Sequence, residues 1–197
     1  MTFVIGLTGS IGMGKSTTAK MFSDMGVPVW DADAVVRGLY DKGGAATELV
    51  RRHYPEAIES GAVSRDKLRE LIAANPKTLD HLQSLVHPLL AENRSAFLKD
   101  PKNKIVLLDI PLLFETGTDT ECDAVVVVTA PADIQRQRVL DRGEMTEEDF
   151  QLILSRQLPD TQKRERARWI IETLSMDAAR QSVKDILAEI KQELEHA

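Results

Sequence analysis

The stretch that decides the fold is FVIGLTGSIGMGKS, residues 3–16. Its first half is a short apolar run that ends in glycine, a pattern typical of a fully buried parallel strand. Its second half, GSIGMGKS at residues 9–16, matches G-x-x-x-x-G-K-[ST] in full. The residues that follow have a helical pattern, which Gly26 ends. A strand, a glycine-rich loop and a helix in this order predict a phosphate-binding loop.

The residue types of this loop suit the binding of phosphate. Glycines let the backbone wrap an anion without Cβ clashes, and the loop N–H groups and the helix start favour its negative charge. Lys15 would reach the β- and γ-phosphates, and the Ser16 hydroxyl would be a magnesium ligand. The alternative is a glycine-rich turn that binds nothing. We predict a nucleoside triphosphate site formed by Gly9, Ile11, Gly12, Met13, Gly14, Lys15, Ser16 and Thr17.

Four more strand candidates follow along the chain. They are residues 27–31, 105–109, 124–129 and, more weakly, 169–171, and helical patterns separate them. This alternation predicts an α/β fold, a mostly parallel five-stranded sheet flanked by helices, of the P-loop nucleotide-kinase-like type. The C-terminal segment reads as an amphipathic helix. Its apolar side carries Val183, Ile186, Leu187, Ile190 and Leu194.

The region from about Tyr40 to Asp100 breaks the alternation, because it shows helix-like pieces and no convincing strand. We interpret it as a helical substrate-binding insertion, in which Pro88 would kink or restart the last helix. The predicted organisation is a nucleotide-binding core of residues 1–40, 101–135 and 156–197, an insertion of residues 41–100 and a lid of residues 136–155.

Composition narrows the function classes. Among 197 residues 43% are hydrophobic, and no stretch approaches the length of a membrane span. A net charge of −6 argues against a dedicated nucleic-acid binder. Cys122 is the single cysteine, so no intramolecular disulfide can form, and it reads as a small filler at a strand entrance. We expect a monomer of the reducing cytoplasm with no membrane or nucleic-acid partner.

The use of the triphosphate is a separate question. Residues 103–106, NKIV, have only the first half of the guanine signature N-K-x-D, and no apolar strand precedes the D-x-x-G match at residues 41–44. We therefore favour a small-molecule kinase over a GTPase. A nucleotide-binding regulator with weak hydrolysis is the alternative from another class, and the acidic residues described next argue against it.

Acidic residues end two of the predicted strands. Asp109 ends the strand at 105–109, where it would join the magnesium shell or, alternatively, cap a helix. Asp31 ends the strand at 27–31, and Asp33 follows two residues later. These aspartates would either cap the next helix or face an acceptor. Beside a phosphate loop we favour the second interpretation. Asp33 would be the base or orienting carboxylate and could also cap the helix, while Asp31 would support the site on the metal side.

Arginines follow the fourth strand candidate. Gln135, Arg138 and Arg142 are spaced i, i+3 and i+7, so a helix would place them on one face. Guanidinium groups there would clamp the phosphates, with Arg138 binding nucleotide and Arg142 stabilising the transferring group. The alternative is a solvated helix surface. Residues 142–149, RGEMTEED, have the glycine and polar character of a lid hinge.

The chain resembles the dephospho-coenzyme A kinase family. The resemblance rests on IGLTGSIGMGKST, VPVWDAD, VHP, DIPLLFE and QRQRVLDRG, with RQ and K downstream, in order over nearly the whole chain. It implies transfer of the ATP γ-phosphoryl group to the ribose 3′-hydroxyl of dephospho-coenzyme A with Mg²⁺. It also implies that Asp33 is the acceptor-side carboxylate and Arg142 the lid arginine. Leu113, Phe114 and Glu115 would lie near the acceptor.

Two points qualify what the resemblance implies. His87 in the VHP motif joins the candidate acceptor-binding residues, although a lone histidine on an apolar stretch more often has a structural role. The family's A-D-x-V-I-x-N-x-G turn near the adenine reads ARWIIETLS here, with Arg168, Thr173 and Ser175 at the changed positions. No adenine contact is carried over to this turn. A nucleoside or nucleoside-monophosphate kinase is the alternative enzyme.

Overall fold

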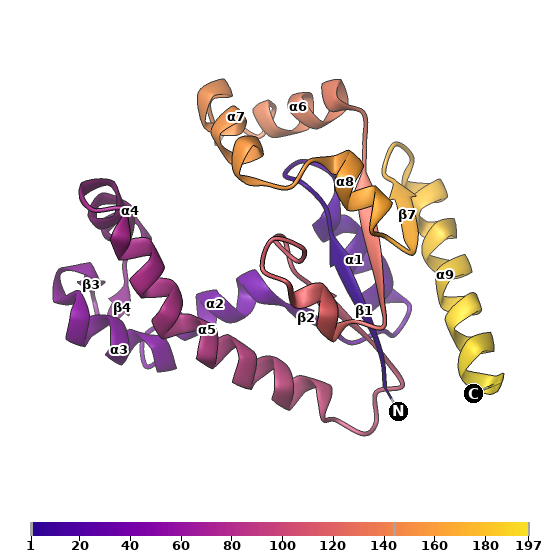
Figure 1. The fold of residues 1–197 in the computed structure, drawn as a ribbon, viewed down its shortest axis with the longest axis horizontal. Helices are drawn as coiled ribbons and strands as arrows, with labels where there is room; N and C mark the ends of the chain where they lie inside the picture. The colour runs from indigo at the N-terminus through magenta and orange to yellow at the C-terminus, as the bar shows by residue number, and fades with distance from the viewer. Residues whose placement is uncertain (1, 144, 197) are drawn as a thin grey trace. The chain divides into compact units, whose positions relative to one another are not determined.

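A computed structural model describes residues 2–143 and 145–196, and Glu144 of the predicted lid hinge lies outside them. The chain divides into two compact units (Figure 1). The first consists of residues 1–30 and 101–197, and the second of residues 31–100. Within the described part, no helix combines the length and the apolar character that crossing a membrane requires.

The first unit is built on a five-stranded sheet in the order β2-β5-β1-β6-β7, which confirms the predicted fold class. The strand β1 pairs in parallel with β5 and β6, and β6 pairs in parallel with β7. Parallel strands bring their carboxyl ends to one edge of a sheet, and the loops after them gather there. The strands are β1 (Phe3–Thr8), β2 (Val29–Asp31), β5 (Ile105–Asp109), β6 (Ala124–Thr129) and β7 (Trp169–Glu172).

Two helices cover one face of this sheet. They are α1 (Lys15–Asp24) and α9 (Met176–His196). Phe22 of α1 and Ile190 of α9 are fully buried with Ile5 of β1 in one hydrophobic cluster. The predicted apolar side of the C-terminal helix is thereby confirmed, because all its residues but the partly buried Leu194 are in the core.

The opposite face is covered partly by the loop after β5. A Cβ at Gly6 of β1 would lie 2.8 Å from both Cys122 Sγ and Leu113 Cδ2. Cys122 thus fills space at the entrance of β6, as the sequence predicts. The remaining elements of this unit are η2 (Thr118–Glu121), α6 (Ala132–Leu140), α7 (Glu147–Arg156) and α8 (Asp160–Glu165).

The second unit is largely helical, as predicted, but it contains a small antiparallel hairpin that the sequence analysis missed. Each strand has two residues, too few to show an alternating pattern, and Ser60 (φ 51°) and Gly61 (φ 87°) form the turn. The elements are α2 (Ala32–Tyr40), α3 (Ala45–His53), η1 (Pro55–Ala57), β3 (Ile58–Glu59), β4 (Ala62–Val63), α4 (Arg65–Ala74) and α5 (Lys77–Leu98).

Two features of the second unit differ from expectation. The unit begins at Asp31, because α2 packs against α3 and α5 of the same unit. The helix α5 runs through Pro88 without restarting, so the predicted restart is wrong. Proline removes a single N–H, here the donor to the Ser84 carbonyl, and the turns on either side keep the helix intact.

Candidate active site

The phosphate loop has a backbone that only glycine adopts readily at two positions. Gly12 has φ 78° and Gly14 has φ 88°. A Cβ at Gly12 would also lie 2.7 Å from Val139 Cγ2, and one at Gly14 would lie 3.1 Å from the Thr173 side chain. The predicted glycine requirement therefore has two causes, the left-handed backbone and the close approach of α6 and of the turn after β7.

Two glutamine side chains hold the tip of the loop. The Gln135 amide donates to the Ile11 carbonyl at 2.7 Å, and the Ile11 N–H donates to Gln157 Oε1 at 3.2 Å. Gln135 lies on α6 and is 5% exposed, whereas Gln157 is the first residue after α7. Both backbone groups of Ile11 are thus paired with side chains that lie just before and just after the predicted lid, which fixes the direction of the loop.

Thr173, in the turn after β7, holds the other end of the loop. Its hydroxyl donates to the Met13 carbonyl at 2.8 Å. Arg138 donates through Nη1 to Thr173 Oγ1 at 2.9 Å and through Nη2 to the Thr173 carbonyl at 2.5 Å. The turn that departs from the family pattern therefore ties Arg138 to the loop backbone. This arrangement places the guanidinium that we predicted to bind nucleotide beside the loop.

A buried ion pair joins the start of α1 to the end of β5. Lys15 Nζ lies 2.5 Å from Asp109 Oδ1, and the two side chains are 15% and 5% exposed. Asp109 is the last residue of β5, and Lys15 is the first of α1. A phosphate-binding cation and a carboxylate of the kind that magnesium prefers are therefore adjacent at the edge of the sheet.

A pocket of about 240 Å³ opens beside the loop, inside the first unit. Its lining is mixed, with polar side chains such as Thr17, Arg138 and Arg142 and the apolar side chains of Met21 and Met176. A purine ring has apolar faces and polar edges, so a pocket of this mixed character suits the base of a nucleotide whose phosphates lie on the loop. The sequence analysis gave neither Met21 nor Met176 a role in nucleotide binding.

Arg142 lies outside the helix on which we predicted it. The helix α6 ends at Leu140, so the predicted helix face shared by Gln135, Arg138 and Arg142 is wrong for the last of them. Arg142 nevertheless lines the same pocket as Arg138, one residue before Gly143, which has φ 67°. Arg142 is exposed and lies in the turn between α6 and α7, which is the predicted hinge.

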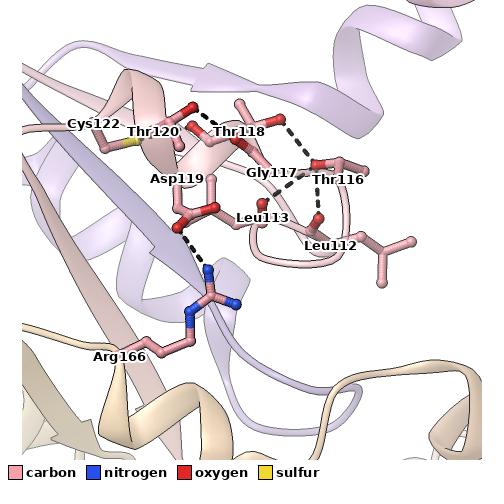
Figure 2. Close-up of polar contacts among 9 residues, drawn as sticks. All are labelled: Leu112, Leu113, Thr116, Gly117, Thr118, Asp119, Thr120, Cys122 and Arg166. Atoms are coloured by element: carbon pink, nitrogen blue, oxygen red, sulfur yellow. Dashed lines mark hydrogen bonds and ion pairs between the residues drawn. The ribbon is translucent and has the colours of Figure 1, made fainter.

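The DIPLLFE loop after β5 is folded on itself by short-range polar contacts (Figure 2). The Thr116 hydroxyl donates to the Leu112 carbonyl at 2.8 Å and contacts Thr118 Oγ1 at 2.9 Å. Arg166 Nη2 lies 2.8 Å from Asp119 Oδ2. The Arg166 guanidinium also covers the Phe114 ring, with its central carbon 4.2 Å from the ring centroid. The loop is thus a compact unit that the residue just beyond α8 holds in place.

The predicted acceptor-binding residues of this loop point largely inward. Leu113 is fully buried and Phe114 is 6% exposed, whereas Leu112 is 40% exposed. An apolar contact from this loop to a ligand would therefore come from Leu112, which the sequence analysis did not select. Acceptor contacts of Leu113 and Phe114 stay a prediction.

Glu115 of the same loop is engaged with the chain beyond the lid. Glu115 Oε1 lies 2.9 Å from Lys163 Nζ and accepts from the Leu158 N–H at 2.7 Å. Burial alone would raise the pKa of the Glu115 carboxyl. The hydrogen bonds from Lys163 and Leu158, together with the Lys163 charge, hold that pKa below its ordinary value of 4.5. Glu115 therefore anchors the loop to the fully buried Lys163 of α8, and contact with an acceptor stays a prediction.

The second unit holds the other predicted residues. Asp31 is the N-cap of α2, because its carboxylate accepts from the Ala34 N–H at 2.9 Å. Capping by Asp33 is therefore wrong, because Asp33 lies in the first turn of the helix, where its side chain is exposed. His87 is exposed on α5, so it is not a core histidine. The roles of Asp33 and His87 toward an acceptor stay predictions.

Three residues that position the phosphate loop or the loop after β5 were given no role in the sequence analysis. Gln157 and Lys163 belong to the RQ and K of the family resemblance, and Thr173 was noted only as a departure. Each acts through a contact between residues far apart along the chain, for which no local pattern exists.

Among the described residues, no three His, Cys, Asp or Glu side chains gather as a metal cluster. A magnesium ion here would thus need phosphate and water ligands, as is usual for that ion.

Comparisons with known proteins cover almost all of the chain. The family model for dephospho-CoA kinase matches residues 3–177. A dephospho-CoA kinase of Cereibacter sphaeroides is 55% identical over 190 residues, 96% of each chain. The crystal structure of TT1252 from Thermus thermophilus is 33% identical, with a TM-score of 0.83 over 95% of this chain and 97% of that one. A dephospho-CoA kinase from Campylobacter jejuni, 23% identical, shares the fold with a TM-score of 0.74 over 98% of this chain and 99% of that one.

The contact between Gln157 and Ile11 predicts a specific loss of nucleotide affinity. Gln157→Leu removes the acceptor for the Ile11 N–H and should raise the Kd for ATP by about tenfold, the equivalent of one unmade hydrogen bond. Gln157→Glu keeps an oxygen acceptor and should restore most of the affinity. Isothermal titration calorimetry with ATP checks both. A matched control is Gln151→Leu on the exposed side of α7, where the amide contacts only Glu147. Equal affinities for Gln157→Leu and the wild type would contradict this role.

The Glu115–Lys163 pair predicts a pH-dependent stability. Glu115→Gln leaves the Lys163 charge buried without its partner and should cost about 3 kcal/mol of unfolding free energy at pH 7. Because the folded-state pKa of Glu115 is lowered, the wild-type advantage is present above pH 4.5 and is lost as the pH falls below that value.

Urea unfolding at several pH values measures this difference. Glu165→Gln, on the exposed side of α8, is the control and should change little. A Glu115→Gln deficit that stays constant down to pH 3 would argue against the ion pair as its cause.

Proposed function

The chain belongs to the dephospho-CoA kinase family, and from that premise we propose that it transfers the γ-phosphoryl group of ATP to the ribose 3′-hydroxyl of dephospho-CoA. This is the final step of coenzyme A biosynthesis. The family match over residues 3–177 carries the proposal. The complete phosphate loop supports it, because the loop supplies the site that such a transfer needs.

The triphosphate would lie on the phosphate loop of the first unit. Its phosphates would accept from the N–H groups of Gly12, Gly14 and the first turn of α1, where the helix dipole favours negative charge. The base would enter the pocket beside Thr17 and Met176. Arg138, held by Thr173, would contact the phosphates from the α6 side. The nucleotide-binding set is completed by Gly9, Ile11, Met13, Lys15 and Ser16.

We propose Ser16 and Asp109 as the protein's share of a magnesium site. The hydroxyl and the carboxylate are oxygen donors, as this ion requires, and they sit on the two elements that meet at the Lys15–Asp109 pair. When bound, magnesium neutralises charge on the β- and γ-phosphates. The residues present fit that task, with phosphate and water as the remaining ligands.

The chemistry is an in-line displacement. The acceptor 3′-oxygen forms a bond to the γ-phosphorus, the bond from that phosphorus to the β,γ-bridging oxygen breaks, and ADP leaves. Asp33 takes the hydroxyl proton. Lys15 and Arg142 meet the charge that builds on the transferring group. Positioning supplies most of the rate, and the base typically contributes a factor of about 10²–10⁴.

Each part of the chain has a place in this proposal. The second unit, residues 31–100, binds the acceptor through Asp31, Asp33 and His87, together with Leu113, Phe114 and Glu115 of the loop after β5. The lid, residues 136–155, closes over the nucleotide. Magnesium is the metal ion, ATP and dephospho-CoA are the substrates, and the protein acts as a monomer in the cytoplasm.

An acceptor panel tests the function. ADP release from ATP is measured with dephospho-CoA, adenosine, AMP and shikimate at equal concentration. We expect strong stimulation by dephospho-CoA alone. Strong stimulation by AMP with none by dephospho-CoA would support the nucleoside-monophosphate kinase alternative. Slow hydrolysis that no acceptor changes would support a nucleotide-binding regulator.

The role of Asp33 has a separate test. Asp33→Asn should lower kcat by about 10²–10⁴-fold, because the amide cannot take the proton, and leave the Kd for ATP nearly unchanged. Asp66→Asn, at another exposed position of the second unit, is the control and should keep wild-type turnover. Wild-type turnover of Asp33→Asn would refute the assignment.

A further inference from the structure

A second pocket lies wholly within the second unit and has no assigned role. It has a volume of about 480 Å³, in the range of small-molecule sites. Its lining includes Arg37, Gly38 and Tyr40 of α2, Val63 and Arg65, and one acidic residue, Asp41. The pocket is distinct from the nucleotide pocket of the first unit, and we call it the Arg37–Arg65 pocket.

The two arginines of this pocket are available to an anion. Arg37 Nη2 lies 3.9 Å from Asp31 Oδ2, and both side chains are about half exposed, 54% and 42%. Ion pairs of this length and exposure contribute little, so exchanging that carboxylate for a ligand phosphate costs little. Arg65, at the first position of α4, is exposed. A guanidinium group suits phosphate because it can donate two parallel hydrogen bonds.

Gly38 gives a second, independent reason to expect a ligand. Glycine is unfavourable in a helix relative to alanine, yet Gly38 stands within α2. Apart from its chain neighbours and the backbone of its own helix, no atom of the described residues lies within 4 Å of the place where its Cβ would be, so packing against other elements does not explain it. Because Gly38 lines the pocket, its missing side chain leaves the backbone of α2 open to a ligand.

Tyr40 adds a hydrogen-bond donor. Burial raises the pKa of the Tyr40 phenol above its ordinary value of 10.0, although the Arg65 charge acts in the other direction. The phenol therefore keeps its proton at neutral pH and can donate to a phosphoryl oxygen.

The spacing along α2 relates the pocket to the proposed reaction. Asp33 and Arg37 are four residues apart, so they share a face of α2 about one helical turn, or roughly 5.4 Å, apart. That length is close to the span of a ribose 5′-phosphate from its 3′-oxygen to its phosphorus. An acceptor with its 3′-hydroxyl at Asp33 would thus reach Arg37 with its 5′-phosphate.

We propose that the Arg37–Arg65 pocket binds the 5′-diphosphate of the acceptor nucleotide and thereby sets the enzyme's preference for acceptors that carry one. The proposal rests on the proposed function, because it takes the 3′-hydroxyl to lie at Asp33. It assigns the two arginines to recognition of the acceptor and leaves binding of the triphosphate to the first unit.

Steady-state kinetics with dephospho-CoA test the proposal. Arg65→Ala and Arg37→Ala should each raise the KM for dephospho-CoA by about 10–100-fold, the loss of one or two charge-assisted hydrogen bonds, with the KM for ATP unchanged. Adenosine at high concentration, which has the 3′-hydroxyl and no phosphate, should stimulate ADP release only weakly, and to the same extent in the wild type and in both variants. Arg69→Ala on α4 is the matched control, because Arg69 pairs with the exposed Asp66 and does not line the pocket.

Gly38→Gln separates recognition from a structural role. Glutamine is the better helix former and has room here, so the melting midpoint should stay or rise, while its side chain fills the pocket and raises the KM for dephospho-CoA. A lower midpoint with an unchanged KM would overturn the proposal, as would Arg65→Ala with wild-type kinetics or with equal losses for both acceptors. A wild-type enzyme that does not phosphorylate dephospho-CoA would refute the proposed function itself, and this proposal with it.

Discussion

The backbone of the phosphate loop is the constraint on which the rest of this structure depends. Its glycines at positive φ allow the loop to curve, but they do not fix the curve, because glycine is the most flexible residue. The fixed shape comes from outside, from Gln135 and Gln157 on the two backbone groups of Ile11 and from Thr173 on Met13. A preorganised set of N–H donors pays no ordering cost when an anion binds. The shape of the phosphate loop therefore depends on several other elements of the first unit.

The same elements connect the loop to the rest of the site. Gln157 follows α7, and the next residue, Leu158, donates its N–H to Glu115, which also pairs with the buried Lys163. The segment after α7 is thus bound to the loop after β5. Through Gln157 the same segment is also bound to the phosphate loop. A displacement of α7 would change contacts at the phosphates and at the DIPLLFE loop together.

Elements that depend on patterns among neighbouring residues could be predicted from the sequence. The five strands, the phosphate loop and the C-terminal helix follow from apolar runs and glycine spacing, and the structure confirms them. What the sequence could not provide were contacts across the fold. Arg142 was placed on a helix because its spacing fits one, but α6 ends two residues earlier. Asp31, and not Asp33, caps α2. The sequence did not decide between them, because either aspartate could have preceded the first turn of the helix. The burial of Lys163 could not be predicted from the sequence, because lysine is normally exposed.

The measurement that tests the central claim most directly is the identification of the reaction product. Phosphorus NMR of a mixture of the protein, ATP, Mg²⁺ and dephospho-CoA reports where the phosphoryl group goes. The account predicts a new phosphomonoester signal coupled to the ribose H3′, growing in step with ADP, while the 5′-diphosphate signals stay unchanged. A phosphate at any other position, or ADP and inorganic phosphate as the only new species, would contradict it.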